Sequence, residues 1–96
     1  MTSLKIECEP QRRGWRCHVL VGDDPDVTSH QVTVTRLDMD RFDPGTLDPT
    51  ELVRTSFDFL LEREPKKSIL PTFGLGDIAR YFPEYENTML ARMRPS

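Results

Sequence analysis

The sequence has no long hydrophobic run, and this absence limits where the protein can act. None of its apolar stretches approaches the ~18 residues that a membrane-spanning helix requires. The N-terminal stretch MTSLKIECEP also lacks the basic start and apolar core of a secretory signal. We therefore expect a soluble, cytoplasmic protein that does not contact a membrane.

Positive charge is not in excess either. The chain has 13 Lys and Arg against 16 Asp and Glu, which gives a net charge of −3. An acidic total repels a phosphate backbone, so nucleic acid is an unfavoured partner. With 36% hydrophobic and 30% charged residues in a chain of 96, residues 1–96 are expected to form one small domain around a single core.

Residues that carry chemistry are scarce. The two cysteines and two histidines show neither a CxxC nor an HxxxH spacing, so no metal site and no other cofactor is predicted. His18 directly follows Cys17 and therefore points to the opposite face of a strand, which separates a nucleophile from its base. Asp38 and Asp40 have the spacing of the first two ligands of an EF-hand loop, but position twelve of that loop is Pro49. We expect no catalytic residue, and no enzyme.

Three segments of the first half predict strands. Residues 4–9, 15–22 and 30–35 alternate in polarity with the period of two that is typical of a strand with one buried face. A turn at QRRG aligns the first two segments so that apolar residues pair on one face and opposite charges pair on the other. The predicted pairs are Leu4 with Val21, Ile6 with Val19, Cys8 with Cys17, Glu7 with His18 and Glu9 with Arg16.

The second and third strands are expected to be joined by the loop DDPDVTS, which is rich in turn-forming residues. The register that we predict sets Val19 opposite Val34 and Val21 opposite Val32. The three strands would then form an antiparallel meander.

The cysteines and histidines have simple structural interpretations in this sheet. Cys8 and Cys17 become neighbours on the inner face, near the distance at which a disulfide can form. Because nothing in the sequence indicates export, we expect two free thiols in a reducing compartment. His18 is expected beside Glu7 on the polar face, and His30 is expected to be solvated near the acidic turn that follows the second strand.

Two helix starts follow the strands. Thr35 and Asp38 have capping-box spacing and predict a short helix through RLDMDRF. Asp48 as the cap, with Pro49 at the first helical position, predicts a longer helix over residues 49–64. The apolar side chains of the longer helix span roughly 200° of its circumference, twice the stripe of a helix that lies on one surface. This helix should therefore be covered on two sides.

Residues 75–93 are expected to provide the second cover, because apolar residues recur there at spacings of three and four. Pro83 interrupts this stripe, which makes the segment either one kinked helix or two helices that share a face. Leu60 lies in the middle of the apolar arc and is expected to be buried. Linkers are possible only at 43–48 and 65–74. The predicted fold class is α+β, a three-stranded antiparallel β-meander followed by a long helix and a kinked C-terminal helical segment packed on one sheet face.

Aromatic residues are concentrated near the C-terminus of the chain. Four fall within residues 73–85, more than one side of a kinked helix can bury against a single neighbour. Aromatic residues at a partly exposed rim, with charges around them, are typical of protein interfaces. The alternative is that a compact core takes all four. The predicted protein-binding residues, for another protein or a second copy of the chain, are Phe73, Arg80, Tyr81, Phe82, Glu84 and Tyr85.

A DNA-binding function is the second hypothesis. The stretch GDIARYF resembles the first helix of many bacterial helix-turn-helix domains. The following stretch, PEYENTML, offers only Asn87 as a reader of bases, and the basic clusters at 12–16 and 66–67 lie elsewhere. We therefore favour a non-catalytic protein-interaction or oligomerisation module. A nucleic-acid-associated regulator, antitoxin-like or helix-turn-helix, is the alternative.

The second half of the chain carries a resemblance. The stretches FLLEREPK, SIL and YFPEY resemble a signature of short uncharacterised bacterial proteins of about this length. The resemblance implies a bacterial-type soluble protein and nothing about mechanism. The order of three strands and a helix is also similar to antitoxins of the HicB type, which is an analogy of fold only.

Overall fold

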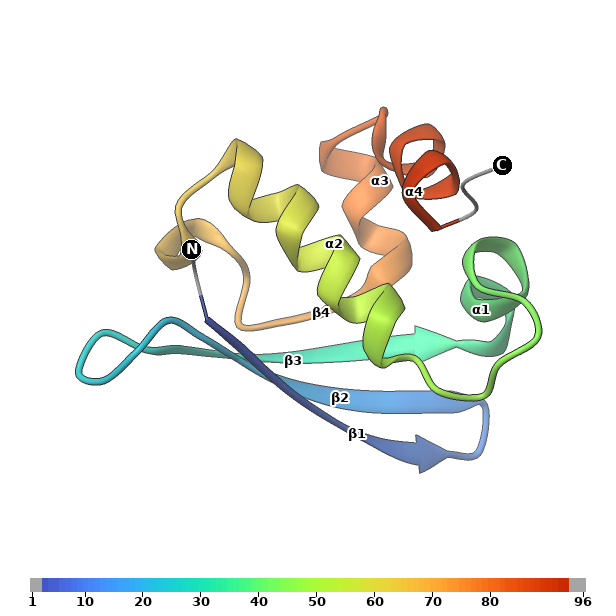
Figure 1. The fold of residues 1–96 in the computed structure, drawn as a ribbon, viewed down its shortest axis with the longest axis horizontal. Helices are drawn as coiled ribbons and strands as arrows, with labels where there is room; N and C mark the ends of the chain where they lie inside the picture. Colours follow the sequence, from blue (N-terminus) through green and yellow to red (C-terminus); the bar gives the residue numbers. More distant parts are fainter. Residues whose placement is uncertain (1–2, 94–96) are drawn as a thin grey trace.

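The computed structural model describes residues 3–93, which form an α+β fold with one sheet and a layer of helices on one of its faces (Figure 1). The sheet contains β1 (Leu4–Gln11), β2 (Gly14–Val21), β3 (Thr28–Thr35) and β4 (Thr72–Gly74), in the order β1-β2-β3-β4. The helices are α1 (Arg36–Phe42), α2 (Thr50–Arg63), α3 (Ile78–Tyr81) and α4 (Tyr85–Met93), with short 3₁₀ turns at Lys66–Ser68 and Leu75–Asp77. The predicted meander and its helical cover on one face are therefore present, but the sheet has a fourth strand.

The register between β1 and β2 is the predicted one. Leu4 faces Val21, Cys8 faces Cys17, and Glu7 faces His18 on the other side of the sheet. Val19 and Val34 are fully buried, whereas Glu7, His18 and Thr33 are exposed, so the inner and outer faces are also as predicted. Gly14, which begins β2, lies so close to β3 that a Cβ atom there would overlap the Val34 carbonyl.

The register between β2 and β3 differs from the prediction. Val19 faces His30 and not Val34, which is a shift of four residues along β3. The loop is shorter than expected because β3 begins at Thr28. A shift by an even number leaves every side chain on its own face, so the buried valines satisfy either register. The shift does change which residue His30 faces. In the observed register His30 lies opposite the buried Val19 and is 3% exposed, so the prediction of a solvated His30 is wrong.

The cysteines form a disulfide in the structure. Cys8 and Cys17 are joined across β1 and β2, and no free cysteine occurs among residues 3–93. The prediction that they are cross-strand neighbours is confirmed, and the structure has a disulfide where we expected two free thiols. Cys17 is fully buried and Cys8 is half-buried, so the bond ties the first strand to the inner face of the sheet.

The segment 65–74, where the sequence allows a linker, is structured. After a 3₁₀ turn at Lys66–Ser68, Thr72–Gly74 pair with β3 in parallel, with Phe73 opposite Val32. The amide of Gln31 donates to the Pro71 carbonyl at 2.7 Å. This strand places Phe73 on the inner face at 8% exposure.

The helices begin and end where their capping residues predict, within one residue or two. Thr35 and Asp38 form the predicted capping box of α1, since each side chain accepts from the backbone amide of the other. The long helix starts at Thr50, one residue later than predicted, so Pro49 and not Asp48 is the N-cap. The Asp48 carboxylate still accepts from the Thr50 amide at 3.0 Å. Hydrogen bonds from Thr50 lower the pKa of Asp48. At residue 82 the backbone becomes extended, so the C-terminal segment is two helices, the second of the two predicted alternatives.

The core lies between the sheet and the helices as one cluster of buried residues. α2 is buried on two sides, as its wide apolar arc predicts, and Leu60 is 4% exposed. Tyr85 is the largest fully buried residue, and its hydroxyl is 2.8 Å from the hydroxyl of Ser56. Its ring meets Phe59 and Phe42 edge-on, with centroids 5.2 Å and 5.7 Å away. Burial strongly raises the pKa of Tyr85.

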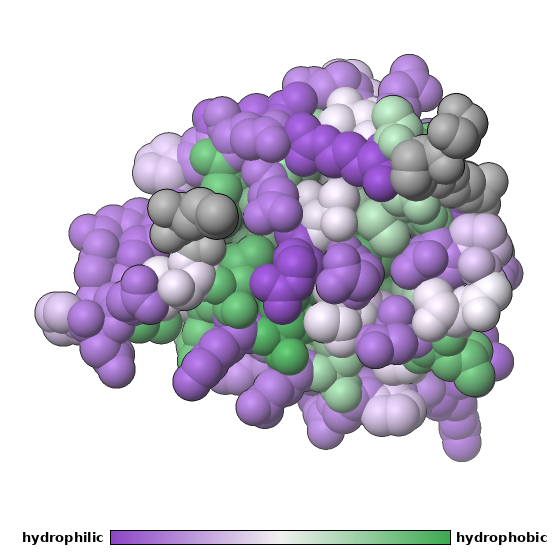
Figure 2. All heavy atoms as spheres, viewed as in Figure 1, coloured by the Kyte–Doolittle hydropathy of each residue, from purple (hydrophilic) through white to green (hydrophobic). Residues whose placement is uncertain are grey.

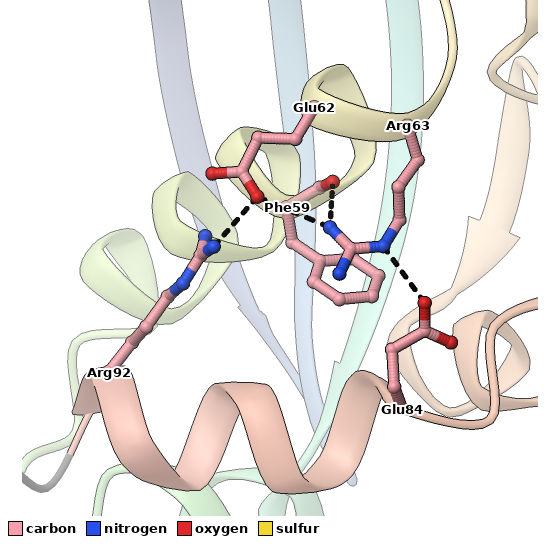
Figure 3. Close-up of polar contacts among 5 residues, drawn as sticks. All are labelled: Phe59, Glu62, Arg63, Glu84 and Arg92. Carbon is pink, nitrogen blue, oxygen red and sulfur yellow. Dashed lines mark hydrogen bonds and ion pairs between the residues drawn. The ribbon is translucent and has the colours of Figure 1, made fainter.

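An arginine on α2 ties this helix to the C-terminal helices (Figure 3). The Arg63 guanidinium lies over the Phe59 ring, 3.6 Å from its centroid, and donates to the Phe59 carbonyl and to Glu84 at 3.1 Å each. Beside it, Arg92 of α4 donates to Glu62 of α2 at 2.7 Å. The Arg92 hydrogen bond lowers the pKa of Glu62, and the backbone amide of Glu84, followed by Arg63, lowers the pKa of Glu84.

Candidate functional site

A groove of about 390 Å³ lies between the C-terminal end of α2, the segment 66–73 and α3. This volume is within the range of known ligand and peptide pockets. The groove is lined by ten residues, which are Leu60, Glu64, Ser68, Ile69, Leu70, Phe73, Asp77, Ile78, Tyr81 and Phe82.

The floor of the groove is apolar and built from the core. Leu60 of α2, Ile69 before β4 and Ile78 of α3 are exposed by 4%, 5% and 3%. Because these side chains also pack into the cluster beneath, the floor is as rigid as the core itself.

The rim is partly exposed and acidic. Leu70 and Tyr81 are 47% and 67% exposed, and both stand at the edge of the same apolar groove. Glu64 and Asp77 contribute two carboxylates, and no Lys, Arg or His is among the described residues that line the groove. The groove therefore offers apolar surface beside negative charge.

The exposed position of Leu70 has a local cause in the buried histidine. His30 Nδ1 lies 2.8 Å from the Leu70 carbonyl, and its Nε2 lies 2.9 Å from the Thr28 hydroxyl. Since a carbonyl can only accept, Nδ1 donates to Leu70, while Nε2 is hydrogen-bonded to the Thr28 hydroxyl. The histidine thus holds the backbone of residue 70 against β3 while the neighbouring Ile69 is buried and the Leu70 side chain faces outward.

The opposite wall depends on the short helix α3. Asp77 accepts from the Gly74 amide at 3.1 Å, which fixes the turn between β4 and α3. The Phe82 amide donates to the Ile78 carbonyl and closes the helix one residue before Pro83. The break leaves Tyr81 on the outside of the last turn, and Phe82 half-buried against Phe59.

The six predicted protein-binding residues separate into two groups. Phe73, Tyr81 and Phe82 line the groove, although Phe73 is largely buried. Arg80 is exposed but does not line it, and Glu84 is paired with Arg63. Tyr85 is 1% exposed and belongs to the core, so its assignment to a partner surface is wrong, because Phe42, Phe59 and Ser56 surround it from two other helices.

Seven of the ten residues that line the groove, and His30 behind it, were not predicted as site residues. Leu70 and His30 depend on the fourth strand, which the sequence did not reveal. Glu64 and Asp77 look like ordinary charges at a helix end and a turn. A usable signal was the pair Ile69 and Leu70, since adjacent residues of an extended segment point to opposite sides.

A second depression lies on the outer face of the sheet and is polar. Its volume is about 270 Å³, and Glu7, Glu9, Arg16 and His18 are among its lining residues. Glu9 faces Arg16 and Glu7 faces His18 across the strands, so these side chains have cross-strand neighbours of complementary character. His18 Nε2 is also 2.6 Å from the Ser29 hydroxyl.

Residues 3–93 show neither a metal site nor a membrane-spanning helix. In this part of the chain no three His, Cys, Asp or Glu side chains are grouped so that they could hold a metal ion. Within the same range, no helix has the length and apolar character that crossing a membrane requires. In comparisons with known proteins, no family model matches the chain, and neither a curated protein nor a solved structure is significantly similar to it.

Proposed function

We propose that this chain is a non-catalytic protein-interaction module. Its groove would hold a segment of another protein in which a bulky apolar side chain is flanked by Lys or Arg. The observation that carries this proposal is the groove itself, because core side chains form its floor while Leu70 and Tyr81 stand exposed at its rim. A partly exposed tyrosine beside an apolar pocket is typical of interaction hot spots.

The acidic rim supports a basic partner. Glu64 and Asp77 are the charged residues that line the groove within residues 3–93. A cation that enters beside the apolar anchor can pair with either carboxylate and can also lie over the Tyr81 ring. An acidic segment would meet two like charges at the same place.

The nucleic-acid alternative requires that the basic residues gather on one face, and the fold separates them. Arg12 and Arg13 lie at the turn before β2, whereas Lys66 lies beyond its other end, where it pairs with Asp26 of the β2–β3 loop at 3.2 Å. The eight residues of β2 therefore lie between the two clusters, a span of about 26 Å at ~3.3 Å per residue. We propose this function only second.

The expected family and compartment stay predictions. The bacterial-type signature FLLEREPK…SIL…YFPEY is a resemblance that the comparisons leave untested. A cytoplasmic location is likewise an expectation, and the disulfide between Cys8 and Cys17 favours an oxidising compartment instead. Alkylation of the protein at the moment of cell lysis would decide which state the cysteines have in the cell.

Selection from a library of displayed random peptides on the immobilised full chain tests the proposed function. We expect the selected peptides to share a bulky apolar residue next to Lys or Arg. Their binding should weaken about tenfold or more in the variant Leu70→Ser/Tyr81→Ser, since both side chains stand at the rim. Leu37→Ser/Leu47→Ser is the matched control, because these leucines are 79% and 82% exposed and lie outside the groove.

Three results would contradict the proposal. The first is a failure to select any peptide. The second is an equal loss of binding in the groove variant and in the control variant. The third is a set of peptides that are consistently acidic, which would leave the groove without its predicted charge preference. Circular dichroism and thermal melting establish that both variants remain folded.

A further inference from the structure

The first strand forms an open edge of the sheet. β1 pairs with β2 on one side, and no other described strand pairs with its second side. It is eight residues long, whereas the opposite edge strand, β4, has three. Soluble proteins usually protect such an edge by shortening it or by placing proline or inward-pointing charges on it. β1 is not short and has no inward-pointing charge, so its protection consists of Pro10 near the end of the strand and the exposed charges of Lys5, Glu7 and Glu9.

The backbone groups that face the open side can be assigned from the pairing with β2. The Gly22 amide donates to the Ser3 carbonyl at 2.8 Å, which extends the ladder and shows that odd-numbered residues bond to β2. Hydrogen-bonded and non-hydrogen-bonded pairs alternate along an antiparallel ladder. The amides and carbonyls of Leu4, Ile6 and Cys8 therefore point away from β2.

An apolar strip accompanies these backbone groups. Leu4, Ile6 and Cys8 are half-buried side chains that pack at the margin of the core. Figure 2 shows hydrophobic surface beside the N-terminal half of β1, below α2, on a face that is otherwise largely hydrophilic. A strand laid along this edge would cover the strip as well as satisfy the backbone.

Charge selects one register for a second copy of the same strand. In an antiparallel pair centred on Ile6, Lys5 of each copy faces Glu7 of the other, and Leu4 faces Cys8. A pair centred on Glu7 would oppose two Glu7 carboxylates, and one centred on Lys5 would oppose two ammonium groups. Of these three registers, the one centred on Ile6 joins opposite charges without setting two like charges opposite each other, and it also leaves the imino nitrogen of Pro10 outside the central ladder.

We propose that two copies of this chain associate through β1, with a two-fold axis at Ile6, to form one continuous sheet of eight strands. Leu4, Ile6 and Cys8 each donate one backbone hydrogen bond to the second copy and accept one from it. The Lys5–Glu7 pairs are non-hydrogen-bonded pairs, in which opposite side chains lie closest. This interface is separate from the groove and does not depend on the function proposed for it.

Sedimentation equilibrium of the full, oxidised chain over a range of concentrations tests the interface by charge reversal. Lys5→Glu and Glu7→Lys should each raise the dissociation constant about tenfold, because each change sets like charges opposite each other twice in the dimer. The double variant Lys5→Glu/Glu7→Lys should restore dimers, since it exchanges the two charges. Glu9→Lys is the control for register, because Glu9 faces Lys5 only if the pair is centred on Glu7.

The possible outcomes all bear on the proposal. Loss of dimers in each single variant and their recovery in the double variant support it, as do unchanged dimers in Glu9→Lys and in the groove variant Leu70→Ser/Tyr81→Ser. A wild type that is monomeric at every concentration overturns it. Dimers that survive both single reversals, or that are lost in the groove variant, overturn it as well, because the contact would then lie elsewhere.

Discussion

The two edges of the sheet differ in what they offer to another molecule. At the β4 edge the strand is only three residues long, and the surface beside it is a groove made of side chains from α2, α3 and the segment 66–73. At the β1 edge the strand is eight residues long, and backbone groups alternate along an open side. A short edge strand favours recognition through side chains, whereas a long open one favours strand addition.

The largest expected effect is at Leu60, which belongs to the core and to the floor of the groove. Leu60→Ala should lower the free energy of unfolding by about 2–5 kcal/mol, because it leaves a cavity at a buried site. Leu61→Ala, at a half-buried neighbour on the same helix, is the matched control and should cost less. A loss below about 1 kcal/mol for Leu60→Ala in denaturant melts would mean that the groove floor is not part of a rigid core.

The next effect concerns the β1 edge. Replacing the disulfide by Cys8→Ala/Cys17→Ala should lower the free energy of unfolding by about 2–4 kcal/mol, because the bond restricts the unfolded chain. Reduction of the wild type is the matched control, since it breaks the bond but keeps both side chains. Equal denaturant midpoints for the oxidised and reduced wild type would show that the disulfide does not stabilise this edge.

A substitution of His30 tests the β4 edge, because this residue anchors the backbone of Leu70 there. His30→Leu removes two hydrogen bonds and should lower the free energy of unfolding by about 1–3 kcal/mol. The variant should also weaken peptide binding in the groove, because the backbone of Leu70 loses its anchor to β3. Dimer formation should not change. If sedimentation shows that His30→Leu alters dimerisation as much as peptide binding, the two edges are not independent.

The smallest effect is a pH dependence at the junction of α2 with the C-terminal helices. The pKa of Glu62 and that of Glu84 are lowered from 4.5, so their stabilising contribution is present above about pH 4.5 and lost as the pH falls through the lowered pKa values. The difference in thermal midpoint between wild type and Glu62→Gln/Glu84→Gln should therefore shrink from pH 7 to pH 3. A difference that stays constant would exclude these carboxylates as the cause. Both are exposed, so the difference should be small.

The sequence predicts the pairing of β1 with β2 correctly, because two independent patterns lead to the same register. Between β1 and β2, apolar pairing on one face and charge pairing on the other allow only one register, and the structure has that register. Between β2 and β3 the charges give no such check. Registers that differ by four residues then bury the same valines, and the prediction chose the wrong one.

The C-terminal half was predicted less well for a different reason. Three residues are too few to show a strand period, and a parallel strand pairs with a partner about forty residues away, so β4 has no local signal. The periodicity of residues 75–93 predicts the stripe that faces α2. The periodicity does not show which aromatic residue a third helix encloses. In the structure this residue is Tyr85, while Tyr81 is 67% exposed. Half of the predicted binding residues therefore line the groove.

The most direct test of the central claim, that side chains beside β4 form the site for another protein, is an amide NMR titration. The labelled chain would be titrated with the peptide selected on the wild type. We predict that the resonances that shift belong to residues 64–82, while those of Leu4, Ile6 and Cys8 stay unchanged. Shifts confined to β1 or to the polar sheet face, with residues 64–82 unaffected, would contradict the claim.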